Sequence, residues 1–244
     1  MVKKGDTLIE VVLAIGIFSM VAIAVVAVMT GGTSSTQNAL ETTLTREEID
    51  TQAEALRFIH ASYLADENTE DKPFTKLWDK IISNAYVPQL DVSENQKYQQ
   101  YNPSTCQSIY DDGDGGVLSK AFVINPYKLA SSDPSSAYIK YNNSDSDKFK
   151  QALTYPHLIF GEDVTNNTDN SSLASSVNST DLFQAAGIFV IAVKDPDSTR
   201  VVGNTGKKAT YYDFYIRTCW YSTGSDTPST ISTVIRLYDP KGIK

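Results

Sequence analysis

The chain begins with its most apolar stretch. From Leu8 to Met29 almost every residue is apolar, and the only charged residue among them is Glu10. At about 1.5 Å rise per residue, a helix over this stretch is long enough to cross a hydrocarbon layer about 30 Å thick. The pattern therefore predicts a transmembrane helix over residues 6–30.

A second helical pattern follows Gly31 and Gly32, two residues of a type that can break or kink a helix. Apolar residues recur every three to five positions and charged residues fill the other face, which predicts an amphipathic helix over residues 31–65. Together the two stretches form a helix of about 57 residues, roughly 85 Å long. The apolar positions expected to face a head domain are Leu40, Leu44, Ile49, Ala53, Leu56, Ile59 and Tyr63.

Residues 66–244 are predicted to form the globular head. Pro73 suits the first turn of a short helix, whose expected core positions are Phe74, Leu77, Trp78, Ile81, Ile82 and Ala85. The middle of the chain is mixed, with candidate strands over Val117 to Ile124 and Leu158 to Phe160 and long polar loops between them. Such loops are typical of surface excursions.

The last third carries the clearest β pattern. Apolar or alternating runs predict strands over Ile188 to Val193, Thr210 to Tyr221 and Thr230 to Tyr238. Gly, Pro, Asn and Asp residues separate them, which favours an antiparallel meander. A long helix before a C-terminal antiparallel sheet gives an α+β fold class.

Composition excludes several classes of function. The chain of 244 residues has 21 basic and 29 acidic residues, a formal net charge of −8, so direct nucleic-acid binding is not expected. Two cysteines and two histidines are too few for a zinc site, and His60 is expected to be a packing or surface residue. We find no nucleophile, phosphate-binding or triad motif, and we expect neither enzyme activity nor a cofactor.

Two further patterns have weak functional interpretations. The segment from Asp111 to Gly116 has clustered carboxylates but lacks the ligand spacing of a calcium loop, so we expect a turn. Asn142, Asn166, Asn170 and Asn178 each begin an Asn-x-Ser/Thr triplet, which leaves glycosylation open.

The residues before the span orient it. Lys3 and Lys4 favour a cytoplasmic N-terminus and place residues 30–244 outside the membrane. The span is compatible with a cleaved secretory signal, a permanent anchor or an anchor with a further use; no small-x-small cleavage site near Met29 supports the first.

The N-terminus combines three features: Lys3-Lys4-Gly5, then Asp6-Thr7-Leu8-Ile9-Glu10, then the apolar run. In this combination it resembles the N-terminus of type IV pilins and pseudopilins. The resemblance covers about 25 residues. It implies cleavage by a prepilin peptidase after Gly5, so that residues 1–5 are the leader, Asp6 is the first mature residue and Glu10 the fifth. The family usually has phenylalanine where this chain has Asp6, which leaves methylation of the new N-terminus open. The span also lacks the family's frequent proline.

Glu10 then has two interpretations. A carboxylate solvated at the headgroup level needs no partner, whereas one inside an apolar bundle needs a cation. In the family this glutamate meets the N-terminal amine of a neighbouring subunit. Leaving the charge unpaired costs about 3–5 kcal/mol, which is enough to set the register of assembly. Asp6 adds a like charge one turn before Glu10.

Cys106 and Cys219 both lie outside the membrane in this topology, where an oxidising environment favours a disulfide over two free, buried thiols. The bridge would close a loop of more than a hundred residues, a contribution of roughly 4–5 kcal/mol. A similar C-terminal bridge occurs in many pilins.

The resemblance implies a structural subunit of a pilus-like filament that serves adhesion and surface motility. Its expected partners are further copies of itself, the prepilin peptidase, an assembly platform in the membrane and minor pilins. The precursor would lie in the cytoplasmic membrane and the assembled subunit at the cell surface. The alternatives are a minor pilin or pseudopilin of a secretion or DNA-uptake system, and a single-pass membrane-anchored binding protein that does not polymerise.

Overall fold

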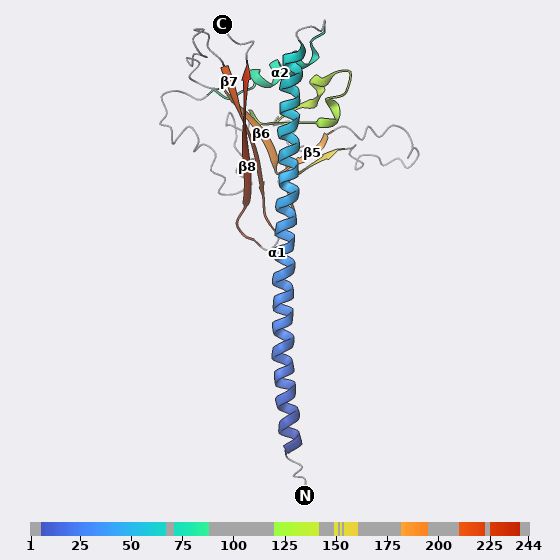
Figure 1. Cartoon of the computed structure of the whole chain (residues 1–244), viewed down its shortest axis with the longest axis vertical. Helices are drawn as coiled ribbons and strands as arrows, with labels where there is room; N and C mark the ends of the chain where they lie inside the picture. Colours follow the sequence, from blue (N-terminus) through green and yellow to red (C-terminus); the bar gives the residue numbers. More distant parts are fainter. Residues whose placement is uncertain are drawn as a thin grey trace, which may run out of the picture.

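A long N-terminal helix carries a mixed head on its C-terminal half (Figure 1). The computed structural model describes residues 6–66, 71–87, 120–141, 149–150, 152, 154–160, 182–194, 210–222 and 225–239. The helix, α1, contacts a five-stranded antiparallel sheet that includes the C-terminal strands. The α+β fold class is thereby confirmed.

Helix α1 runs from Asp6 to Ala65 without interruption. The predicted continuation of the helix from the span into the amphipathic stretch is confirmed, and Gly31 and Gly32 do not interrupt it. Each glycine costs about 1 kcal/mol of helix propensity, but extending an existing helix is far easier than starting a new one. The hydroxyl groups of the nearby threonines also donate hydrogen bonds to main-chain carbonyls one turn earlier, as Thr33 Oγ1 does to Met29 O at 3.1 Å.

Helix α2, Pro73–Ser83, confirms the predicted short helix. Its core positions Leu77, Trp78 and Ile81 are fully buried. The residue before it, Lys72, adopts a left-handed conformation with φ 44° and gives no side-chain cap. Asp66 at the end of the preceding segment supplies the cap instead, because its Oδ2 accepts a hydrogen bond from Thr75 N at 2.9 Å.

The main sheet has the order β2-β1-β6-β7-β8. The predicted meander is confirmed, because β6, β7 and β8 are consecutive antiparallel neighbours. The five strands are β1 (Phe122–Ile124), β2 (Tyr138–Lys140), β6 (Ile188–Lys194), β7 (Thr210–Trp220) and β8 (Ser229–Asp239). Two short 3-10 helices, η4 (Pro126–Lys128) and η5 (Pro134–Ala137), connect β1 to β2.

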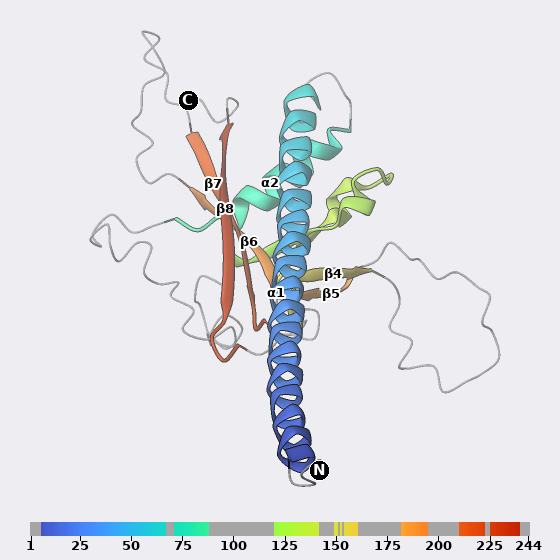
Figure 2. The same cartoon turned by 60° about the horizontal axis from the view of Figure 1, so that its bottom comes forward.

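A second, three-stranded sheet has the order β3-β5-β4 and was not predicted. Its strands are β3 (Phe149–Lys150), β4 (His157–Phe160) and β5 (Leu182–Ala186). Only the β4 segment had been recognised as a strand. Figure 2 shows β4 and β5 on one side of α1 and β7 and β8 on the other. Gly187, with φ 65°, lies between β5 and β6 and lets the chain pass from the small sheet to the large one.

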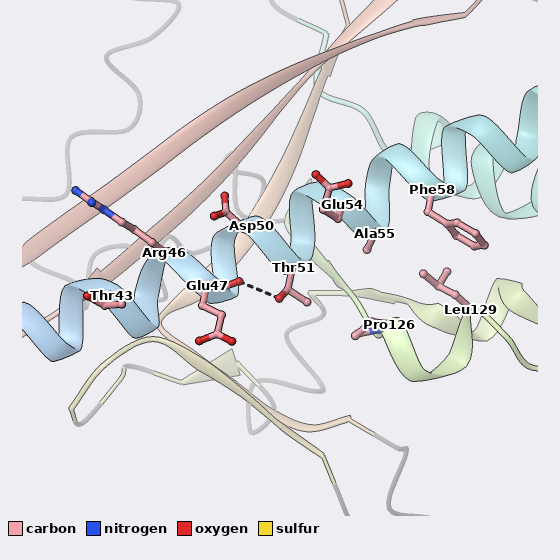
Figure 3. Close-up of a pocket in the computed structure, with 10 residues that line it drawn as sticks. All are labelled: Thr43, Arg46, Glu47, Asp50, Thr51, Glu54, Ala55, Phe58, Pro126 and Leu129. Carbon is pink, nitrogen blue, oxygen red and sulfur yellow. Dashed lines mark hydrogen bonds between the residues drawn. The ribbon is translucent and has the colours of Figure 1, made fainter.

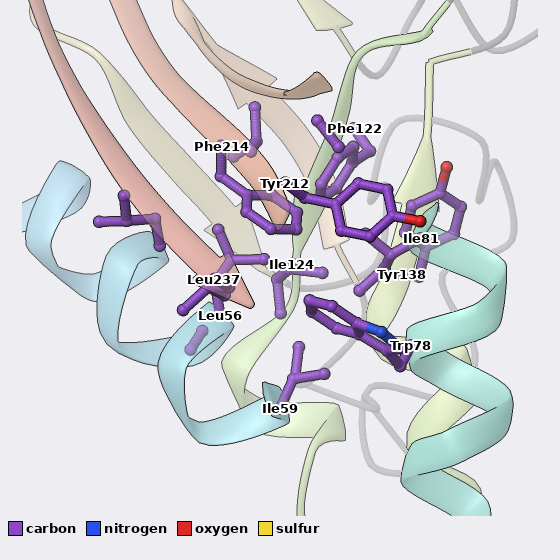
Figure 4. Close-up of a cluster of buried hydrophobic side chains, with 14 of the residues drawn as sticks. Leu56, Ile59, Trp78, Ile81, Phe122, Ile124, Tyr138, Tyr212, Phe214 and Leu237 are labelled. Carbon is purple, nitrogen blue, oxygen red and sulfur yellow. The ribbon is translucent and has the colours of Figure 1, made fainter. Parts of the chain in front are cut away.

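The core lies between the C-terminal half of α1, α2 and one face of the main sheet. Figure 4 shows side chains from all three meeting there, including Leu56, Trp78 and Phe214. Trp78 stacks on Tyr63, with ring centroids 5.3 Å apart. The predicted helix positions from Ile49 to Tyr63 are buried, but Leu40 is 58% exposed. That expectation was wrong because the head's contact with α1 begins only at Glu41.

Candidate functional site

The N-terminal half of α1 is exposed along its whole length. Every residue from 8 to 40 is exposed, including the large apolar side chains of the predicted span. Within the described residues, α1 is the one helix that is long and apolar enough to cross a membrane. An apolar surface of this extent is not left in water by a folded protein, so this half of α1 suggests membrane association.

Glu10 lies near the start of this exposed half. Asp6 is the first residue of α1 and Glu10 follows one turn later, with its side chain exposed. No ion pair of the described residues involves Glu10. Lys3, Lys4 and Gly5 lie outside the described residues, so the leader, its cleavage and the role of Glu10 stay predictions.

Polar residues of α1 connect the long helix to the head. Gln52 is fully buried. Its Nε2 donates to Ile124 O at 2.8 Å, and its Oε1 accepts from Ile124 N at 2.9 Å. Strand β1 pairs with β6 only through Phe122 and Val190, so at Ile124 the amide takes the place of a neighbouring strand. This contact sets how far along the sheet the helix lies.

A buried carboxylate lies at the end of the head that is nearest to the exposed half of α1. Glu41 is 7% exposed, and its Oε2 accepts a hydrogen bond from Trp220 Nε1 at 3.1 Å. One turn later Thr45 is fully buried and donates from Oγ1 to Glu41 O at 2.7 Å. The indole N–H and the carboxylate satisfy one another where α1 passes the end of β7.

Glu48 faces the small sheet. Its burial raises the pKa of the carboxyl above the usual range, while a hydrogen bond to the main chain of Leu158 and the nearby His157 act in the opposite direction. The charged form of Glu48 is therefore disfavoured by the contact between α1 and β4.

The last turns of α1 are held by the end of β8. Tyr63 Oη donates a hydrogen bond to Asp239 Oδ1 at 2.8 Å, and burial with this bond raises the pKa of Tyr63. His60 Nε2 lies 2.7 Å from Tyr238 O. His60 thus has the packing role expected from the sequence.

An open groove of about 720 Å³ follows the outer side of α1 in the head (Figure 3). Its apolar part includes Phe58, Pro126 and Leu129, and its other side carries carboxylates of α1 such as Glu47 and Asp50. No nucleophile–base pair is present among its lining residues. The groove is a surface feature without evident chemistry.

The remaining predicted features fall mostly outside the described residues. Cys219 is fully buried near the end of β7, but Cys106 lies outside the described part, so the disulfide stays a prediction. The segment from Asp111 to Gly116 and the four Asn-x-Ser/Thr triplets also lie outside it. Within the described residues, no group of His, Cys, Asp or Glu is arranged to hold a metal.

Sequence reasoning missed Glu41, Gln52 and Glu48. The helical spacing could have found two of them, because Glu41 and Gln52 occupy positions on the same face as Thr45, Ile49 and Leu56. A polar residue on an apolar stripe indicates a buried partner. Glu48 gave no such indication, because its environment comes from β4, more than a hundred residues later in the chain.

Comparisons with known families, with characterised proteins and with solved structures gave no match. The structure by itself defines the class of architecture: a long apolar N-terminal helix packed on an antiparallel sheet, which is a pilin-like arrangement. Its exposed apolar half suggests membrane association.

Proposed function

We propose that the chain is a structural, non-enzymatic subunit of a type IV pilus-like filament. It is made as a membrane-anchored precursor, cut by a prepilin peptidase after Gly5 and assembled through α1. The observation that carries this proposal is the exposure of every residue from 8 to 40 on a helix that continues unbroken into the head. Lipid covers the apolar part before assembly, and neighbouring copies of α1 cover it afterwards.

The continuity of α1 favours assembly over simple anchoring. A binding protein that only needs attachment to a membrane functions with a flexible linker between its span and its head. Here the helix passes through Gly31 and Gly32 and is fixed to the head by Glu41 and Gln52. The span and the head are therefore rigidly connected. Packing of the α1 helices in a filament then fixes the positions of the heads.

In the filament, Glu10 pairs with the amine that cleavage creates at Asp6 of a neighbouring copy. A misplaced subunit leaves this carboxylate unpaired in an apolar bundle, at a cost of about 3–5 kcal/mol. The membrane assembly platform and minor pilins are the further partners, and the filament lies at the cell surface, where it serves adhesion and motility.

The test has two parts. Intact-mass measurement of the purified protein is expected to show loss of Met1 to Gly5. Glu10→Ala is then expected to leave this cleavage intact but to remove the subunit from sheared filaments. Ser19→Ala is the matched control, because Ser19 lies on the same exposed half of α1 and bonds only its own helix, at Ile15 O.

An uncut N-terminus would contradict the proposal and favour the single-pass binding protein. Normal incorporation of Glu10→Ala would leave filament formation standing but refute the role of Glu10. A trace of the subunit at filament ends, rather than along their length, would favour a minor pilin or pseudopilin.

A further inference from the structure

One row of side chains on the edge strand β8 faces away from α1. It comprises alternate residues, all of them exposed, which we call the β8 ridge: Thr230, Ser232, Val234, Arg236 and Tyr238. The residues between them point the other way, since Ile235 and Leu237 belong to the core shared with α1. In the strand order of the main sheet, β8 is terminal.

Strand β7 places a second row beside the ridge on the same face. Tyr211 is opposite Tyr238, Asp213 is opposite Arg236, and Tyr215 is opposite Val234. The rings of Tyr211 and Tyr238 lie 5.9 Å apart. Tyr238 is 54% exposed and Val234 49% exposed, so the ridge offers an aromatic ring and an aliphatic side chain to solvent.

Arg236 is held in one orientation at the centre of this surface. Its Nε and Nη2 donate to the two carboxylate oxygens of Asp213 at 2.7 and 2.8 Å. Its guanidinium also lies over the ring of Tyr211, 4.1 Å from the centroid. A guanidinium has five N–H groups, so three remain for another acceptor. Little side-chain entropy is then lost when such an acceptor binds.

The charge of this surface selects the kind of partner. Asp213 neutralises Arg236, whereas the chain as a whole has a formal net charge of −8 and repels polyanions. An uncharged ligand with hydroxyl groups fits better than a nucleic acid. Tyrosine rings, hydroxyl groups and a fixed guanidinium on one surface suit a ring with an apolar C–H face and polar edges.

We propose that the β8 ridge and the adjoining tyrosines of β7 bind a neutral carbohydrate chain. One pyranose ring stacks on Tyr238 and a hydroxyl group of this ring accepts from Arg236. A ring further along the same carbohydrate chain exchanges hydrogen bonds with Ser232, which lies roughly 20 Å from Tyr238 at the rise of a β-strand. This proposal deepens the adhesive role proposed above. The ridge faces away from α1, so a filament built around α1 displays it on the outside in many copies, and weak single contacts add up.

The test uses the full chain, unassembled, in a detergent without a sugar headgroup. Saturation-transfer NMR and calorimetric titration are carried out with cellohexaose, chitohexaose and isomaltohexaose as separate probes. We expect binding of at least one probe, with the largest transfer to ring C–H protons. Because the subunit is unassembled, failure of filament formation does not affect this measurement.

Tyr238→Ala and Arg236→Ala are each expected to weaken that binding at least tenfold. Tyr127→Ala is the matched control: Tyr127 is 61% exposed on η4, away from the ridge, and its loss is expected to leave binding unchanged. Circular dichroism of each variant checks that the head remains folded.

The proposal is overturned if none of the three probes binds to the wild-type chain. It is also overturned if binding survives both ridge substitutions. Concentration-dependent self-association that Tyr238→Ala abolishes would instead assign the ridge to contacts between copies of this chain, and would equally contradict carbohydrate binding.

Discussion

Gln52 of α1 and Ile124 of β1, 72 positions apart in the chain, exchange two buried hydrogen bonds as neighbouring strands do. The side-chain amide supplies one donor and one acceptor in the geometry of a peptide group. The amide thereby fixes α1 to β1 at a position where β1 is no longer paired with β6. The side chain of one residue thus supplies two of the hydrogen bonds that connect the long helix to the head.

Gln52→Ala is therefore expected to destabilise the head by roughly 2–4 kcal/mol, since it leaves the N–H and C=O of Ile124 buried and unpaired. Chemical unfolding of the full chain in detergent, followed by tryptophan fluorescence, measures this change. Thr51→Ala is the control, because Thr51 Oγ1 bonds only Glu47 O on the exposed side, and its effect should stay within about 0.5 kcal/mol. Equal effects of the two variants would contradict the role of Gln52.

Glu48→Gln is expected to stabilise the head at pH 7 and to have little effect near pH 4. The folded-state pKa of Glu48 is raised. Its favourable contribution is therefore present below the unfolded-state pKa and is lost as pH rises through the folded-state pKa. Glutamine keeps an acceptor for the main chain of Leu158 without the charge.

The measurement is the unfolding midpoint of both proteins between pH 4 and 8. Asp50→Asn is the control. Asp50 lies two residues after Glu48 and is exposed, so removal of its charge should not raise the unfolding midpoint at pH 7. A variant that is less stable than the wild type at pH 7 would show that the charge of Glu48 stabilises the contact with β4.

Gly187→Ala is expected to destabilise the head by roughly 2–4 kcal/mol, because overpacking and a left-handed backbone both oppose the new methyl group. An added Cβ would lie 2.6 Å from Cys219 O and 2.8 Å from the Cβ of Ala152. Thermal unfolding measures the loss. Unchanged stability would mean that the passage between the two sheets adjusts without strain.

Gly31→Ala with Gly32→Ala is expected to stabilise α1 locally. A Cβ at either position meets nothing within 4 Å, and each substitution adds about 1 kcal/mol of helix propensity. Hydrogen exchange of the amides around residues 30–36 should slow several-fold, while the unfolding midpoint of the head stays constant. Unchanged exchange rates would show that Gly31 and Gly32 do not limit the local stability of α1.

Part of this protein is determined by local sequence patterns. The apolar run from Leu8 to Met29 and the spacing from Ile49 to Tyr63 are sufficient to predict α1, because a helix satisfies its own main chain and needs only the right side chains on each face. An apolar run located β6 and alternation located β7 and β8, and the sequential order of the three strands makes an antiparallel meander the simplest pairing. The interpretation of Gly5, Asp6 and Glu10 also comes from the sequence, and it stays a prediction.

Tertiary structure decided what depends on distant partners. The two-residue strand β3 and the five-residue strand β5 are too short to show a period, and they exist because β5 pairs with β3 on one side and with β4 on the other. The burial of Gln52 and Glu48 depends on β1 and β4, which no local pattern places beside α1.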